Sequence, residues 1–140
     1  MNRRERDRFD ALLEAVLEAL PARVTALLDE APLIVDDVPS RALRQELGLS
    51  AEDELLCGLH SGTPLTERSV EHGEGLPEMI HLFRAGIIEH AGGWSPWQDE
   101  AGRWWGGEEA IRREIRVTLL HEIGHHFGLE EDDLEELGYG

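Results

Sequence analysis

The sequence predicts an α+β fold in which a small mixed sheet packs on a helix near the C-terminus that carries an H-E-x-x-H pattern. Apolar residues recur at helical spacing over residues 6–20 and 110–120, whereas residues 32–38 and 79–83 are short apolar runs typical of strands. A chain of 140 residues can bury one hydrophobic core without disulfides, so residues 1–140 are expected to form a single domain.

The composition is that of a globular and strongly acidic protein. The hydrophobic share is 41%, and 13 Lys and Arg stand against 30 Asp and Glu, which gives a net charge of −17. Such a charge is repelled by nucleic acid and by anionic membranes, so neither is expected as a partner. Solubility explains the charge more simply than a cationic substrate does. The single cysteine, Cys57, cannot form an intrachain disulfide and is predicted to be a small buried hydrophobe rather than a nucleophile.

The N-terminal segment is predicted to be an amphipathic helix over residues 6–20. Glu14 and Glu18 interrupt its apolar residues, so it is not a signal peptide. Pro21 either begins a second, shorter helix through Leu28 or kinks the first. No stretch is long and apolar enough to span a bilayer, and we therefore expect a cytoplasmic protein.

Short elements follow in the first half of the chain. Residues 32–38 are predicted to form a strand that ends in acidic turn residues. A short helix over 41–47 would be capped by Ser40 and ended by Gly48. Residues 54–60 supply a second strand, and the run at 79–83, described above, is the strongest strand candidate in the chain.

All four tryptophans of the chain lie between Gly92 and Gly107, among several glycines and a proline. Two interpretations stay open for this segment. It is either a loop whose indoles cover the core, which we favour, or a flap over a cleft that binds apolar side chains of a substrate or partner.

The H-E-x-x-H pattern consists of His121, Glu122 and His125 and follows the amphipathic run at 110–120. Each residue of an α-helix advances by about 100°, so two histidines four residues apart point within about 40° of one another and can hold one metal ion. Imidazole nitrogens suit zinc. Glu122 projects from the neighbouring flank, where its carboxylate can accept a proton from an attacking water. This is the chemistry of a zinc hydrolase.

A third ligand must come from beyond the helix. A residue ten positions after His121 on an unbroken helix would lie about 15 Å away along the axis, so the chain is expected to turn back at Gly128. The position after the pattern H-E-x-x-H-x-x-G-x-x is Glu131, and Asp132 is the alternative. Two histidines and one carboxylate are a known catalytic zinc set. His126 lies about 140° around the helix from His121 and is interpreted as structural.

Three segments together resemble the small bacterial zincin-like metallopeptidases, also called minimal metalloproteases. They are HEIGHHFGL at 121–129, LPEMIHLFR at 76–84 and GLHSGTPLTER at 58–68, and the resemblance extends over roughly 30–139. It implies a zincin-like fold, a zinc cofactor, and a peptide or protein as substrate. The family pattern usually has Asp at the position of Glu131, which is a departure in this chain.

The resemblance carries one further implication. In zincins an edge strand lies above the zinc and holds the substrate backbone, and residues 79–83 are the candidate for it. The alternative is an ordinary inner strand. The larger metzincins differ in carrying a third histidine and a later methionine turn, and here no methionine follows Met79.

Two functional hypotheses result. The first is a zinc-dependent metallopeptidase with His121, His125 and Glu131 as metal ligands and Glu122 as general base. The second is a catalytically inert zincin-like domain that binds a metal or another protein, which the small size of the chain favours. His60 and Tyr139 are the candidates for stabilising an oxyanion. The sequence carries no signal of oligomeric state.

Overall fold

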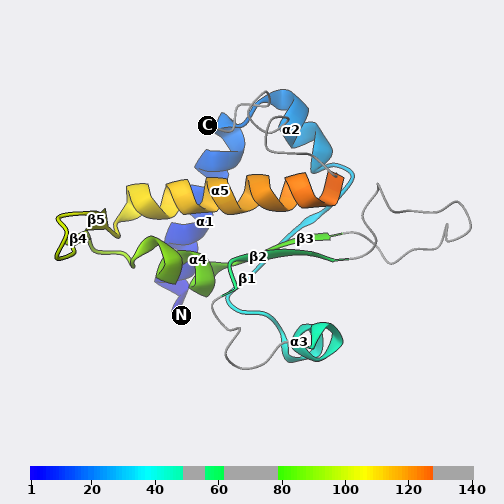
Figure 1. The fold of residues 1–140 in the computed structure, drawn as a ribbon. Helices are drawn as coiled ribbons and strands as arrows, with labels where there is room; N and C mark the ends of the chain where they lie inside the picture. The colour runs from blue at the N-terminus through cyan, green and yellow to red at the C-terminus, as the bar shows by residue number, and fades with distance from the viewer. Residues whose placement is uncertain (49–55, 62–78, 128–140) are drawn as a thin grey trace, which may run out of the picture.

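The computed structural model of the chain describes residues 1–48, 56–61 and 79–127 (Figure 1). Its helices are α1 (Arg3–Ala19), α2 (Ala22–Leu27), α3 (Arg41–Leu47), α4 (Arg84–Ala91) and α5 (Glu108–Phe127). Its strands are β1 (Leu33–Asp36), β2 (Gly58–Ser61), β3 (Met79–Phe83), β4 (Trp97–Gln98) and β5 (Trp104–Trp105). The α+β fold class is confirmed. None of the described helices is long and apolar enough to cross a membrane.

Local signals at the helix ends explain where the first helices begin and stop. The Asn2 side chain accepts a hydrogen bond from the Glu5 N–H at the start of α1. Pro21 is the N-cap of α2, so it begins a second helix rather than kinking the first. The predicted helix at 41–47 is confirmed, because the Ser40 hydroxyl accepts from the Leu43 N–H and Gly48 adopts a left-handed φ of 68° after it.

The main sheet has the strand order β1-β3-β2 and is mixed. β1 runs parallel to β3, while β2 runs antiparallel to it, with Gly58 opposite Leu82 and Ser61 opposite Met79. β3 therefore lies in the middle, and its backbone groups are bonded on both sides. The inner-strand alternative for residues 79–83 is confirmed, and the edge-strand alternative is wrong. Within the described residues, β1 and β2 are the two edge strands of this sheet.

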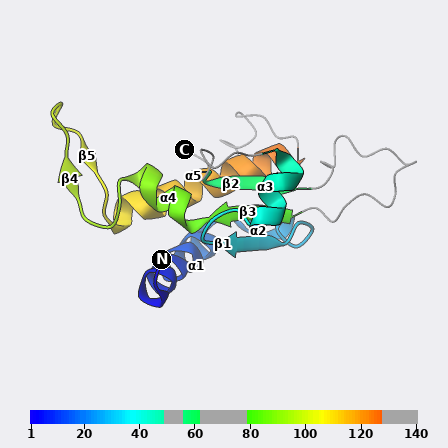
Figure 2. The same ribbon diagram turned by 90° about the horizontal axis from the view of Figure 1, so that it is seen from below.

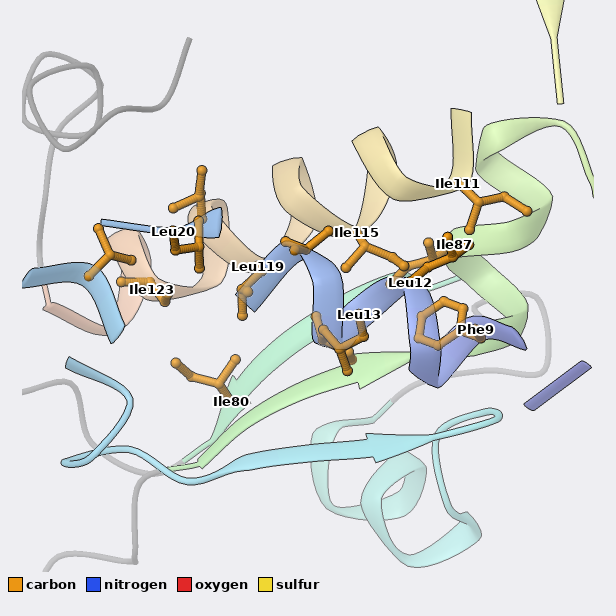
Figure 3. Packing of buried hydrophobic residues seen from close by; sticks show 14 of the residues in the cluster. Phe9, Leu12, Leu13, Leu20, Ile80, Ile87, Ile111, Ile115, Leu119 and Ile123 are labelled. Carbon is orange, nitrogen blue, oxygen red and sulfur yellow. The ribbon is translucent and has the colours of Figure 1, made fainter. Parts of the chain in front are cut away.

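The hydrophobic core fills the space between one face of this sheet and the helices α1 and α5 (Figure 3). Ile80 and Leu82 of β3 point into it, and the buried stripe of α5 packs on them. The core residues are Phe9, Leu12, Leu13, Val16, Leu20, Val24, Ala31, Ile80, Leu82, Ile87, Ala91, Ile111, Ile115, Leu119, Leu120 and Ile123.

Side chains alternate along β3, so His81 and Phe83 lie on the face of the sheet opposite Ile80. The two rings stack with centroids 6.0 Å apart. His81 is buried, and burial lowers its pKa, although the charge of Asp36 raises it in part. Burial therefore favours the neutral form of His81, on the face of the sheet opposite the core.

An ion-pair network ties the N-terminal helix to the sheet and to α4. Arg84 pairs through Nε and Nη2 with the two carboxylate oxygens of Asp10, at 3.0 and 3.1 Å, and through Nη1 with Asp37 at 3.0 Å. Arg6 also contacts Asp37, at 2.7 Å. The hydrogen bond from Arg6 is the main reason why the pKa of Asp37 lies below its usual value. This supports the interpretation of the acids after β1 as structural.

Arg84→Met is expected to lower the free energy of unfolding by about 2 kcal/mol, because it removes the cation shared by the partly buried carboxylate of Asp37 and the exposed carboxylate of Asp10. Arg112→Met is the matched control. Arg112 forms an exposed pair with Glu109, and its loss should cost at most about 0.5 kcal/mol. Chemical denaturation at neutral pH measures both. The Arg84 effect should shrink as the pH falls through the lowered pKa of Asp37, and equal effects of the two variants would contradict the assignment.

The tryptophan-rich segment divides into two parts. Trp94 is partly buried and packs against the core, with the Arg8 guanidinium 4.2 Å above its ring. The other three tryptophans lie on the β4–β5 hairpin, which projects away from the sheet and helices (Figure 2). The core-covering interpretation is thus confirmed for Trp94 only. The hairpin does not cover the H-E-x-x-H pattern, because β5 precedes the N-terminal end of α5 and His121 lies near the C-terminal end of this helix.

Candidate active site

Helix α5 places the H-E-x-x-H pattern at the end of the sheet (Figure 1). Its residues Ile111, Ile115 and Leu119 are fully buried, so one side of the helix is fixed against the core. The prediction that the pattern lies at the end of an amphipathic helix is confirmed. The helix continues through Phe127, the last described residue, and Gly128 lies outside the described part of the chain.

The two histidines lie on the solvent side of this helix. His121 and His125 are exposed, whereas Ile123 and Gly124 between them are buried. Because the histidines are one helical turn apart, their side chains leave the same face. Two imidazoles on an exposed face are a donor pair that zinc accepts, so the described residues fit a zinc ion. The side chain of His126 lies outside the described part, and its structural role stays a prediction.

Glu122 is half-buried, and strand β2 lies directly against it. A Cβ atom placed on Gly58 would come within 3.0 Å of Glu122 Cγ, 2.8 Å of Thr118 Cγ2 and 3.1 Å of the His81 carbonyl oxygen. Only glycine permits this approach, since the contacts would be shorter than van der Waals distance. The backbone of β2 therefore bounds one side of the Glu122 side chain.

The negative charge of Glu122 also acts on Cys57, the residue that directly precedes Gly58. Burial first, and then the carboxylates of Glu114 and Glu122, raise the pKa of the Cys57 thiol to about 11. The thiol is thus protonated at neutral pH, and it packs against the core. Cys57 was predicted to be buried, and it is partly buried against the core, while an acidic flank of α5 faces the start of β2.

The structure brings together two of the three predicted metal ligands and the predicted base. Within the described residues, no group of three or more His, Cys, Asp or Glu is arranged to hold a metal ion. Glu131, Asp132 and Tyr139 lie outside the described part of the chain. His60 belongs to β2 and is paired through its backbone with Ile80, but its side chain is not among those described. The ligand set therefore stays a prediction.

Gly58 is the residue of this site that the sequence analysis did not single out. A glycine at the start of a strand, flanked by apolar residues, is the available signal, because such a glycine often marks a close backbone approach. The sequence alone does not reveal which element approaches it. The structure assigns that element as α5, at Thr118 and Glu122.

The family described as zincin-like metallopeptidase matches residues 28–140, a range that contains Gly58, the whole of α5 and the H-E-x-x-H pattern. No curated protein matches the chain. Membership of this family implies zinc binding, in agreement with the exposed histidine pair on α5. The chain therefore belongs to the zincin-like metallopeptidase family.

Proposed function

We propose that this protein is a zinc-dependent metallopeptidase that hydrolyses peptide bonds with Glu122 as general base. One observation carries the proposal. The motif helix exposes His121 and His125 to solvent, while Glu122 is half-buried against the backbone of β2 at Gly58. A merely solvated helix end would not need a strand packed this closely against Glu122. The family to which the chain belongs supports the same activity.

The zinc would be held by His121, His125 and Glu131, with Asp132 as the alternative third ligand. When bound, zinc supplies Lewis acidity, which polarises the scissile carbonyl and lowers the pKa of the attacking water towards neutral. The two imidazoles must be neutral to bind it, so protons compete with the metal for both side chains.

Glu122 moves the proton in this mechanism. Its carboxylate accepts a proton from the attacking water and later delivers that proton to the leaving amine. Because the backbone of β2 closes one side of the Glu122 side chain at Cγ, the side chain cannot turn towards that side. A base held in this way loses less entropy when the reaction geometry forms.

The strand nearest to Glu122 offers a place for an extended substrate. In the order β1-β3-β2, the outer edge of β2 has no strand beside it within the described part of the chain. A peptide that adds to this edge would gain backbone hydrogen bonds and run close to Gly58 and hence to Glu122. We therefore propose β2, and not β3, as the strand that holds the substrate.

Cleavage of unstructured peptides tests the proposal. Purified protein supplied with zinc is incubated with a mixed peptide library, and new termini are identified by mass spectrometry. We expect cleavage that a chelator abolishes and added zinc restores. Zinc bound at the motif with no cleavage of any peptide would instead favour the inert, metal-binding alternative.

A further inference from the structure

We propose that Thr118 is a positioning residue for Glu122, because its Cγ2 methyl limits where the Glu122 side chain can turn. The inference rests on the proposed function, in which Glu122 is the general base. Thr118 lies on α5 one helical turn before Glu122 and is buried, with 7% of its surface exposed. Its role is therefore to orient the base rather than to bind the substrate or the metal.

The methyl of Thr118 and the Cγ atom of Glu122 pack over one spot on strand β2. A Cβ atom placed on Gly58 would lie 2.8 Å from Thr118 Cγ2 and 3.0 Å from Glu122 Cγ, so both atoms lie within 3.0 Å of one point. Glycine places no atom at this point, and the two side chains meet over the strand there. Each of them therefore limits the space that is open to the other.

The geometry of the helix directs Glu122 towards Thr118. Residues four apart on an α-helix are neighbours on its surface, and long side chains lean back towards the preceding turn. For Glu122, the preceding turn is the one that carries Thr118. The backbone of β2 at Gly58 and the Thr118 methyl therefore confine the Glu122 side chain from two directions.

The strand and the helix that meet at this spot are each held by other contacts. Strand β2 pairs with β3 along its whole length, and the Phe83 N–H donates to the Cys57 carbonyl at 2.8 Å. On the helix, Leu119 and Ile123 are buried in the core. Packed structure relaxes only partly when a buried methyl is removed. Loss of the Thr118 methyl should therefore leave space into which Glu122 can turn.

Thr118 also lies on the flank of α5 that carries the H-E-x-x-H pattern. At about 100° per residue, Thr118 and the three motif residues His121, Glu122 and His125 fall within about 100° around the helix axis. Thr118 is buried, whereas the two histidines are exposed. Threonine is branched at Cβ, so its χ1 rotation is restricted in a helix. Its methyl is thus a stiff boundary between the strand and the motif.

Thr118→Ser tests the role of the methyl, since serine keeps the hydroxyl and lacks Cγ2. We expect kcat on one cleaved peptide to fall about tenfold. A base displaced by about 1 Å can cost about 10²-fold, and here the base is displaced for only part of the time. KM and zinc content should stay at the wild-type level, because the β2 edge and the histidines are unchanged. Thr118→Val keeps the methyl and should keep most of the turnover.

Ile111→Val is the matched control for a general loosening of the helix. Ile111 is fully buried on α5 about three turns before Glu122, and the substitution also removes one buried methyl group. Both substitutions should lower the free energy of unfolding slightly, but Ile111→Val should keep the wild-type kcat. Equal losses of kcat in Thr118→Ser and Ile111→Val would overturn the proposal, because loosening of α5 would then explain both.

The χ1 rotamer of Glu122 gives a readout that does not depend on peptide cleavage. Three-bond Hα–Hβ couplings of Glu122, measured by NMR, report whether χ1 stays in one staggered well. We expect one rotamer in the wild type and in Thr118→Val, and averaged couplings in Thr118→Ser. Averaged couplings in the wild type, or a single rotamer in Thr118→Ser, would overturn the proposal. If the couplings differ as expected but the wild type cleaves no peptide, the proposed function fails while the positioning of Glu122 by Thr118 is supported.

Discussion

Glu122→Gln is expected to lower the rate of peptide hydrolysis by at least about 10²–10⁴-fold while zinc binding stays at the wild-type level. The amide has nearly the same shape as the carboxylate, so the contact with Gly58 is preserved. It cannot accept the proton of the attacking water, and the general-base step is lost. The measurement compares kcat and KM on one cleaved peptide, together with the zinc content of both proteins.

Glu114→Gln is the matched control for this variant. Glu114 lies on the same helix, is also partly buried and also raises the pKa of Cys57, but it lies about two turns before Glu122. It should keep most of the turnover. Wild-type turnover in Glu122→Gln, or an equal loss in both variants, would mean that Glu122 is not the base.

Gly58→Ala should produce the second large effect, on stability and turnover together. The added methyl would meet Thr118 Cγ2 at 2.8 Å and Glu122 Cγ at 3.0 Å, so β2 or α5 must move. Overpacking of this kind costs about 1–3 kcal/mol of unfolding free energy. A base displaced by about 1 Å can cost about 10²-fold in rate. Denaturant unfolding and peptide cleavage measure the two effects.

A second substitution tests the cause of this effect. Thr118→Ser removes the Cγ2 methyl that the new Cβ meets most closely, so the double variant Gly58→Ala, Thr118→Ser should recover much of the lost stability. Its turnover should recover less, because the contact with Glu122 remains. If Gly58→Ala alone has wild-type stability and turnover, the close approach of β2 to Glu122 is not what positions the base.

The sequence predicted those parts of the fold that depend on neighbours along the chain. The helix at 41–47 was found from its cap and its stop, and the strand at 79–83 from its alternation and apolar run. The position of β3 in the middle of the sheet was not predictable, since it depends on pairing with Leu33–Asp36 and Gly58–Ser61, which are distant in sequence. The ion-pair network of Arg84 was not predictable either, because it joins α1, the end of β1 and α4, which are distant in sequence.

In the candidate site, too, the features set by local spacing were predictable, and those set by tertiary packing were not. His121, Glu122 and His125 fit one helical turn, so their spacing alone predicted a shared site. The role of Gly58 arises only from tertiary packing. For the tryptophans, the sequence showed that they cluster in one segment, but it did not show which of them pack on the core. Trp94 joins the core, while the cross-strand pairing of Trp97 with Trp105 builds a hairpin outside it.

The most direct test of the central claim, that α5 holds a catalytic zinc, is the metal content of the purified protein. We expect about one zinc per chain in the wild type, lost in His121→Ala and His125→Ala and retained in His90→Ala, which changes an exposed histidine on α4. Glu131→Ala tests the third ligand in the same experiment and should also lose zinc. A wild-type protein without zinc after reconstitution, or one that keeps its zinc in His121→Ala and His125→Ala, would contradict the account.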